Sequence, residues 1–424
     1  PLTPGFMVLQ GNQLEDLRNV ATQWLADNPL GPLEEECILV QSNGIAQWLK
    51  LALASNDEGT GIAAAIDVQL PGRFIWQAYR SVFPALPTSS PYDKVPMAWR
   101  LYRLFSDWAA LREQLGEQAG LLSPLEGFLQ TDDDPRRCYQ LAMRLADLYD
   151  QYQMYRADWL TAWEKGQDAL PQLQGEPAPL ADEQLWQPLL WRTLVQDIGK
   201  DKPAHDLGSA SRSQIHTAFV QECRKFDLDN RPEGLPRRVI VFSISSLPRQ
   251  TLELLEALSP FTQVMIFATN PCRHYWGDLV EGKQLLQREY RRIAERKIPT
   301  DLNPEDLHAH GHPLLASWGK QGRDFLHLLD EHDEPDSYRQ LFNRHSVDLY
   351  DEPAGNGLLQ QIQSDILDLR SLEERKSLAS QIDPETDHSL QFLVAHSPQR
   401  EVEILHDQLL DSFEQAKKRG ETLN

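Results

Sequence analysis

Cysteine is scarce in this chain. The 424 residues include only Cys37, Cys138, Cys223 and Cys272, and none of these lies within a few residues of another. Zinc sites and dithiol redox centres usually draw on closely spaced cysteine pairs, so the spacing argues against both. A reducing, cytoplasmic setting is the simplest interpretation.

Long apolar runs are also missing. No stretch approaches the roughly 18 apolar residues of a membrane-spanning helix, and residues 1–10 lack the basic flank that opens a secretory leader. We therefore expect a soluble protein with no membrane partner. At 424 residues the chain exceeds the size at which one hydrophobic core stops growing, which predicts two or three domains.

Positive charge is in short supply. The chain has 41 Lys and Arg against 63 Asp and Glu, a formal charge of -22. Because phosphate neutralisation needs clustered cations, any contact with DNA must be local. The basic patches are Arg237-Arg238, then Arg288, Arg291, Arg292, Arg296 and Lys297, and finally Lys417-Lys418-Arg419. Such runs are also common on solvated helix faces, an alternative that the sequence leaves open.

Apolar strands and amphipathic helices alternate at the start of the chain. Residues 6–10 and 37–41 are short apolar runs, each followed by a polar turn and by apolar residues at helical spacing. Residues 62–68 form a third candidate strand, and Pro71-Gly72 opens a further helix. This alternation is typical of a parallel sheet, so the predicted fold class is α/β.

From about residue 94 to residue 230 strand signals disappear and helix follows helix, which predicts a large all-helical insertion that divides the sheet. The later predicted elements are strand 238–243, helix 250–258, strand 264–269, helices 314–329 and 357–369, strand 390–395 and helix 399–413.

The phosphate-binding turn of a nucleotide triphosphatase is absent. A P-loop would follow the first strand, but the turn there is Gln10-Gly11-Asn12-Gln13, without the glycine spacing or the lysine. The strand at 238–243 ends in Ile244-Ser245-Ser246, where a metal-binding strand would carry acidic residues. ATP hydrolysis at this sheet is therefore not expected. Residues 277–283 match the glycine and lysine spacing, but Gln284 replaces the hydroxyl residue and no strand directly precedes them.

Two further groups contain the residue types of a nuclease site or a metal site, but the sequence around them does not fit such a site. Glu374-Arg375-Lys376, with Asp365 and Asp368 upstream, is similar to a nuclease carboxylate and lysine set, but we interpret it as a solvated charged face. His308, His310 and His312 have the chemistry of metal ligands, yet they fall in a loop rich in glycine and proline, which favours a surface loop.

Six longer motifs resemble one family. They are ILVQSNGIAQWL at 38–49, LPGRFIW at 70–76, LADLYDQYQMYRADWL at 145–160, NPCRHYWGD at 270–278, HPLLASWGKQGRD at 312–324 and HSPQREVEILHD at 396–407. Together they resemble RecC, the gamma subunit of the RecBCD helicase-nuclease, exodeoxyribonuclease V. The likeness runs through nearly the whole chain, although it covers only the N-terminal part of the family, whose chains are well over twice as long.

The resemblance implies an inactive superfamily 1 helicase-like fold, in which a RecA-like parallel sheet carries a large all-helical insertion domain. It places the first part of helicase domain 1A at residues 1–93, the insertion domain 1B at 94–236, the continuation of domain 1A at 237–385 and the start of a second helicase-like domain at 386–424. The missing phosphate turn agrees with this expectation on separate grounds.

The resemblance also implies partners. In the family, the subunit binds RecB and RecD, helps to split duplex ends, guides the single strands and scans one strand for the Chi recombination sequence. We therefore expect contacts with double-stranded DNA ends and single-stranded DNA, with ATP and Mg held by the partner subunits and no cofactor or metal in this chain.

Matching the motifs residue by residue transfers the Chi contacts of the family to ten positions. These candidates are Gln41, Asn43, Gln47, Leu70, Trp76, Asp147, Leu148, Asp150, Arg156 and Arg212, the last from a weaker stretch. Amides and carboxylates suit base edges, arginine suits guanine or phosphate, and tryptophan offers a stacking face. The family pattern usually has threonine where this chain has Asn43, which puts the Chi specificity in doubt.

A structural interpretation of these residues stays open. Asp147, Asp150 and Gln151 share one ridge of a helix, which is consistent with a solvated face, and Leu70, Leu148 and Trp76 are also typical core residues.

We expect a non-catalytic DNA-binding and scaffolding subunit of a double-strand-break repair complex. The alternatives are a protein-interaction scaffold without its own DNA site and, less favoured, an autonomous ATP-dependent helicase or nuclease. If the last predicted helix packs on a domain outside this chain, Leu405, Leu409 and Leu410 will be exposed and will drive self-association.

Overall fold

The computed structural model describes residues 2–55, 61–129, 135–172, 176–200, 207–277, 312–332, 349–370, 374–376 and 382–420. The chain divides into two compact units. The first comprises Pro1–Asn270 with Lys320–Leu349, and the second comprises Pro271–Gly319 with Tyr350–Asn424. No helix among the described residues is both long and apolar enough to cross a membrane.

A five-stranded parallel sheet forms the centre of the first unit. Its strands, in spatial order, are β1 (Gly5–Gly11), β7 (Gln263–Thr269), β6 (Arg238–Phe242), β2 (Glu36–Val40) and β3 (Ile66–Gln69). Every neighbouring pair is parallel. The α/β class and the parallel sheet are thus confirmed. Two strands from late in the sequence, β7 and β6, lie between β1 and β2.

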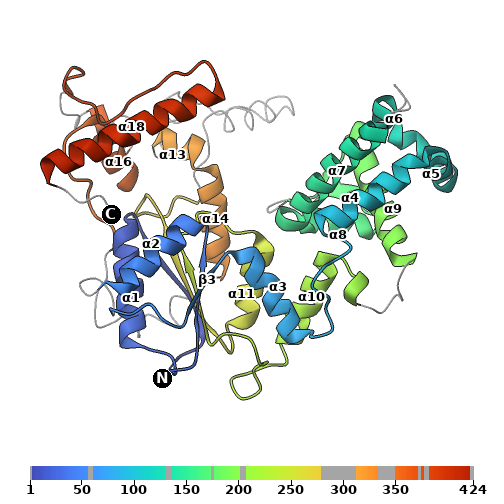
Figure 1. The fold of residues 1–424 in the computed structure, drawn as a ribbon, viewed down its shortest axis with the longest axis horizontal. Coiled ribbons are helices and arrows are strands. Elements are labelled where there is room, and N and C mark those ends of the chain that lie inside the picture. Colours follow the sequence, from blue (N-terminus) through green and yellow to red (C-terminus); the bar gives the residue numbers. More distant parts are fainter. Residues whose placement is uncertain are drawn as a thin grey trace, which may run out of the picture. The chain divides into compact units, whose positions relative to one another are not determined.

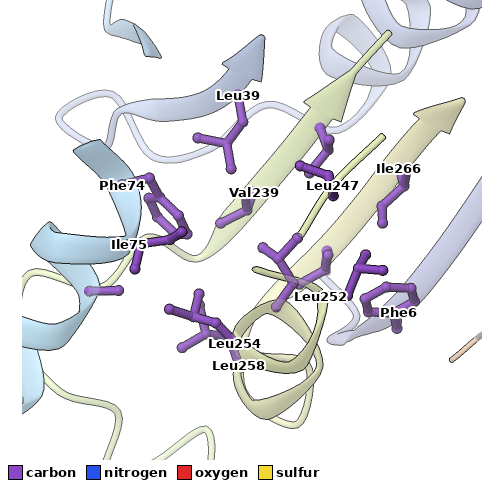
Figure 2. Packing of buried hydrophobic residues seen from close by; sticks show 14 of the residues in the cluster. Phe6, Leu39, Phe74, Ile75, Val239, Leu247, Leu252, Leu254, Leu258 and Ile266 are labelled. Atoms are coloured by element: carbon purple, nitrogen blue, oxygen red, sulfur yellow. The ribbon is translucent and has the colours of Figure 1, made fainter. Parts of the chain in front are cut away.

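Side chains alternate between the two faces of the sheet, as the period of a strand requires. One face packs against α3 (Pro71–Val82), α10 (Arg212–Cys223), α11 (Arg249–Leu258) and α14 (Lys320–His332). Figure 2 shows Phe6, Leu39 and Val239 on this face, directed toward the helices. The other face packs against α1 (Leu14–Asp27) and α2 (Asn43–Ala54). The sheet is therefore the middle layer of three.

A helical region with its own core follows α3 in the sequence (Figure 1). Its helices are α4 (Lys94–Ser106), α5 (Trp108–Leu115), α6 (Ser123–Leu129), α7 (Pro135–Tyr155), α8 (Ala157–Glu164) and α9 (Trp186–Lys200). Its 3-10 turns are η1 (Gly116–Leu122), η2 (Asp182–Gln184) and η3 (Leu207–Ser209). Tyr149, Trp163 and Trp191 are fully buried within it. The sequence patterns missed the two-residue strands β4 (Ala169–Leu170) and β5 (Ala178–Pro179), which are too short to leave a periodic signal.

The helical region contacts the sheet region through α10. This helix lies within the stretch where only helices were predicted, but its apolar side chains Ile215 and Phe219 pack in the core beneath the sheet. On its other side α10 packs against α8, where Gln214 Nε2 donates to Glu164 Oε2 at 3.1 Å. α7 in turn contacts α11. Helices of both regions therefore meet around the start of α10.

The described helices of the second unit are α13 (Pro313–Trp318), α16 (Leu358–Leu367) and α18 (Pro398–Arg419). The helix predicted at 314–329 is interrupted at Gly319, where a Cβ would lie 2.9 Å from the Trp276 ring. The strand predicted at 390–395 was wrong, because these residues have no strand partner among the described residues and Phe392 and Val394 are almost fully exposed. An apolar run forms a strand only where another strand accepts its hydrogen bonds.

Candidate nucleic-acid interface

The carboxyl edge of the sheet carries four of the ten candidate residues. Gln41 follows β2 directly, and Asn43 and Gln47 lie on the first turns of α2, where Ser42 Oγ caps the helix by accepting from Ile45 N at 3.3 Å. Leu70 follows the neighbouring strand β3 and precedes α3. Leu39 is paired with Gln69, so Gln41 and Leu70 follow adjacent parallel strands and differ by one residue in register. All four side chains are exposed at this edge.

Three more candidates meet where α3, α7 and α10 approach one another. The Arg212 guanidinium lies 5.8 Å from the centroid of the Trp76 ring, within cation–π range. Burial raises the pKa of the Asp150 carboxyl, and the charges of Arg212 and Lys94 act to lower it. Arg212 Nε is buried and has no hydrogen-bond partner. We call Trp76, Asp150 and Arg212 the Trp76 cluster. It combines an aromatic ring, a cation with an unused donor and a half-buried acceptor.

A buried polar network lies directly beneath the Trp76 cluster. Tyr79 packs edge-on against Trp76 with ring centroids 5.7 Å apart, and its hydroxyl is 3.0 Å from Nδ1 of His216. Nε2 of His216 is 2.9 Å from Glu253 Oε2. Burial would raise the pKa of Glu253, but the hydrogen bonds and charges of His216 and Arg249 leave it lowered.

Tyr79 lies three residues after Trp76 on α3, and His216 lies four residues after Arg212 on α10. The network therefore fixes the helical turns that carry Trp76 and Arg212. Sequence reasoning missed it, because its members are far apart along the chain and belong to no motif.

Asp147 and Leu148 lie three and two residues before Asp150 on α7. Asp147 forms an ion pair with Lys94 at the start of α4, and this hydrogen bond lowers the pKa of its carboxyl. Leu148 is half-buried against the helical core. The ridge of α7 is thus neither a plain solvated face nor wholly free for a ligand, because Lys94 already engages one carboxylate. Nothing in the sequence near Lys94 marks it as the partner of a residue 53 positions away.

Arg156 differs from the other candidates in being fully engaged locally. Its guanidinium lies 4.0 Å from the Trp159 ring centroid, donates to both Asp158 oxygens at 3.1 and 2.9 Å, and also donates to the Pro171 carbonyl. A bidentate pair and a stacked ring hold it at the junction of α7 and α8. A ligand would therefore have to compete with these contacts.

The turn after β1 is filled by another part of the chain. The backbone N–H of Asn12 donates to the Leu349 carbonyl at 3.2 Å, and a Cβ on Gly11 would lie 2.8 Å from that oxygen. In a P-loop, backbone N–H groups at this turn bind phosphate. Here one of them is used by the chain itself, and Leu349 lies against the space that a phosphate would occupy.

Several other groups singled out in the sequence have different surroundings from those expected. Arg238 is fully buried and binds Glu36, Gln263 and the Asn28 carbonyl, so the interpretations of this patch as a DNA contact or a solvated face were both wrong for it. Asp365 is buried and paired with Arg370 and Arg375, which corrects the predicted solvated face.

His312 is buried as well, so it does not lie on the predicted surface loop. His308, His310, residues 278–284 and the basic patch at 288–297 lie outside the described residues. Within the described residues, no three His, Cys, Asp or Glu side chains are grouped as metal ligands would be.

Comparison with known proteins gives one consistent result. The family model described as RecC, N-terminal domain, matches residues 6–369. The protein named RecBCD enzyme subunit RecC from Escherichia coli K12 is 36% identical over 408 residues, which cover 91% of this chain and 33% of that protein. Its namesake from Haemophilus influenzae is 34% identical over 449 aligned residues, covering 97% and 37%. A more distant namesake from Mycolicibacterium smegmatis is 26% identical, covering 91% and 30%. The chain thus spans about a third of the length of these relatives.

Proposed function

Because the chain belongs to the RecC N-terminal domain family, we propose that it is the DNA-guiding, non-catalytic portion of a RecBCD-type helicase-nuclease subunit in double-strand-break repair. In this proposal it works in the cytoplasm beside RecB and RecD, contacts duplex ends and unwound single strands, and recognises the Chi sequence. ATP and Mg act in the partner subunits.

The proposal gives the chain an inactive helicase-like fold. Residues 1–93 and 237–385 form the RecA-like domain 1A, residues 94–236 the inserted helical domain 1B, and residues 386–424 begin a second helicase-like domain. The separate core of the helical region supports this division. The contact between Asn12 and Leu349 supports the lack of an ATP site, because it takes up a donor that phosphate would need.

The observation that carries the DNA-binding proposal is the Trp76 cluster. A stacking ring, an arginine with an unused buried donor and an acceptor meet at one place, and three helices position them. The exposed amides of Gln41, Asn43 and Gln47 stand at the carboxyl edge of the same sheet region, where open α/β sheets bind ligands. Such groups suit unpaired bases, with amides on base edges and the ring on a base face.

The test is binding of fluorescent single-stranded oligonucleotides, with and without a Chi sequence, followed by anisotropy. We expect Trp76→Ala to weaken binding about tenfold through the loss of one stacked base. Asp150→Asn is expected to remove most of the preference for the Chi oligonucleotide. Trp318→Ala is the matched control, because this tryptophan is 81% exposed and belongs to the second unit. Equal binding by the folded chain and both variants would contradict the proposal.

A second candidate is a protein-interaction scaffold without a DNA site of its own. The observation that favours it is the exposed apolar side of α18, which includes Leu405, Leu409 and Phe413. The same titration separates the two functions, because a pure scaffold shows no affinity for either oligonucleotide while remaining folded.

A further inference from the structure

A groove on the helical region shares Asp147 with the proposed Chi contacts, but its other lining residues have no role in the function proposed above. It has a volume of about 640 Å³ and is lined by residues of α4, α6 and α7. The lining side chains that matter are Lys94, Phe128, Tyr139, Met143, Arg144 and Asp147. We call it the α4–α7 groove.

Aromatic rings at and beside the α4–α7 groove are unusually exposed. Tyr139 is 42% and Phe128 43% exposed, and Trp99, whose ring centroid is 5.7 Å from that of Tyr139, is 56% exposed. Trp99 also packs edge-on against Tyr102, with centroids 5.8 Å apart. Trp99, Tyr102 and Tyr139 support one another, and Trp99 and Tyr139 still keep much of their surface open to solvent. Such faces bind unpaired bases of any sequence, because every base has a π-face.

The charge in the groove suits an anionic ligand. Arg144 is exposed and forms no hydrogen bond or ion pair with any residue that the structure describes. Lys94, the second cation, is held by Asp147. The charge of Arg144 helps to lower the pKa of the Asp147 carboxyl, but its donors are not used by that carboxylate, which Lys94 engages. Arg144 fits a phosphate, which the guanidinium binds through two parallel donors.

The groove also continues from the proposed base contacts. Tyr139, Met143, Asp147 and Asp150 follow one another on α7 at spacings of four, four and three, which places them on one ridge over roughly 16 Å. Asp147 belongs both to the groove lining and to the proposed Chi contacts.

We propose that the α4–α7 groove is a second site for single-stranded nucleic acid, which binds nucleotides flanking those at the Trp76 cluster by base stacking on Tyr139 and a phosphate contact to Arg144. This inference rests on the proposed function. Protein partners also favour aromatic and arginine side chains, but the exposed guanidinium of Arg144 and the shared ridge favour the strand.

The experiment compares two oligothymidylates on the whole chain, one just long enough for the Trp76 cluster and one extended at both ends. Tyr139→Leu is expected to weaken binding of the long oligonucleotide about tenfold and to leave the short one unchanged, and Tyr139→Phe to retain the wild-type affinity. Arg144→Gln is expected to lower the slope of log affinity against log salt by about 0.7 for the long oligonucleotide only. Arg224→Gln removes an exposed arginine at the C-terminal end of α10 and is the matched control.

The outcomes separate the two proposals. Loss of binding in Trp76→Ala together with unchanged binding in Tyr139→Leu and Arg144→Gln overturns the groove site alone, and leaves a protein segment as its occupant. Failure of the folded chain to bind either oligonucleotide overturns both proposals. A loss in Tyr139→Leu that is equal for the two lengths also overturns the groove site, since it places the effect at the Trp76 cluster.

Discussion

The helices α7 and α18 carry similar amphipathic patterns but have different surroundings. α7 spans 21 residues and buries Leu145, Ala146 and Tyr149 against the other helices of its region. α18 spans 22 residues, yet Ala416 is its one buried residue, and Leu405, Leu409 and Phe413 are about half exposed. An apolar stripe therefore indicates that a helix has a partner, but not that the partner lies in the same stretch of chain.

Charged groups on the two helices differ in the same way. On α7, residues from other helices set the pKa values: Lys94 of α4 lowers that of Asp147, while burial raises that of Asp150 against the charge of Arg212. On α18, the pKa of Glu403 is lowered by Arg400 and Gln399 of the same helix. Residues of other helices thus shift the pKa values of Asp147 and Asp150 on α7, whereas residues of the same helix shift that of Glu403 on α18.

Removing one aromatic ring from each helix should change the stability of the protein by very different amounts. Tyr149→Ala deletes a fully buried ring and its hydrogen bond to the Gln187 carbonyl, so we expect it to lower the free energy of unfolding by about 4 kcal/mol. Phe413→Ala, at an exposed position, is expected to change it by about 0.5 kcal/mol or less. Urea denaturation followed by near-UV circular dichroism measures both. Similar losses in the two variants would show that α18 is packed in solution.

The next effect concerns self-association through α18. Its apolar side chains are exposed along one side of the helix, and we expect the isolated protein to associate through them as its concentration rises. Leu405→Glu with Leu409→Glu is expected to weaken that association at least tenfold, because each new charge would have to be buried. Gln415→Glu adds a charge at another exposed position of the same helix and is the control. Light scattering that shows a wild-type monomer at every concentration would contradict the prediction.

Much of the sheet was predictable from the sequence, because strands such as Phe6 to Gln10 are buried on both sides and give continuous apolar runs. The order of the strands was not predictable, because no local sequence pattern indicates that β6 and β7 lie between β1 and β2. The false strand at 390–395 arose from the same limitation: its residues have strand propensity, but pairing decides whether a strand forms.

The candidate site was predictable only as single positions. Family motifs supplied Trp76, Asp150 and Arg212, but the meeting of three helices that brings them together depends on packing between residues more than 60 positions apart. The same holds for Lys94 beside Asp147 and for His216 between Tyr79 and Glu253. These partners follow no local period, so sequence patterns could not reveal them.

The carboxylates of α7 and α18 are expected to make small, pH-dependent contributions to stability. Burial raises the pKa of Asp150 in the folded protein above its value in the unfolded chain, which is about 3.9. The free energy of unfolding therefore falls as the pH rises through the pKa of the unfolded chain, and it becomes constant above the pKa of the folded protein. Asp150→Asn should remove this loss and raise the free energy of unfolding at neutral pH by about 0.5 kcal/mol, a small gain because solvent screens the half-buried group.

The pKa shift of Asp147 has the opposite sign to that of Asp150. Lys94 lowers its folded pKa, so its contribution is present above the unfolded value and is lost as pH falls through the folded one. Asp147→Asn should therefore slightly destabilise the chain at neutral pH. Glu403→Gln on α18 should act in the same direction, through a contact within one helix. Urea titrations from about pH 3 to about pH 7 test the three variants together. If Asp150→Asn and Asp147→Asn change the free energy of unfolding in the same direction, residues of neighbouring helices do not determine the pKa values of these two carboxyls. If Asp150→Asn stabilises the protein while it weakens Chi preference, the cost of keeping that carboxylate half-buried is a cost of DNA recognition.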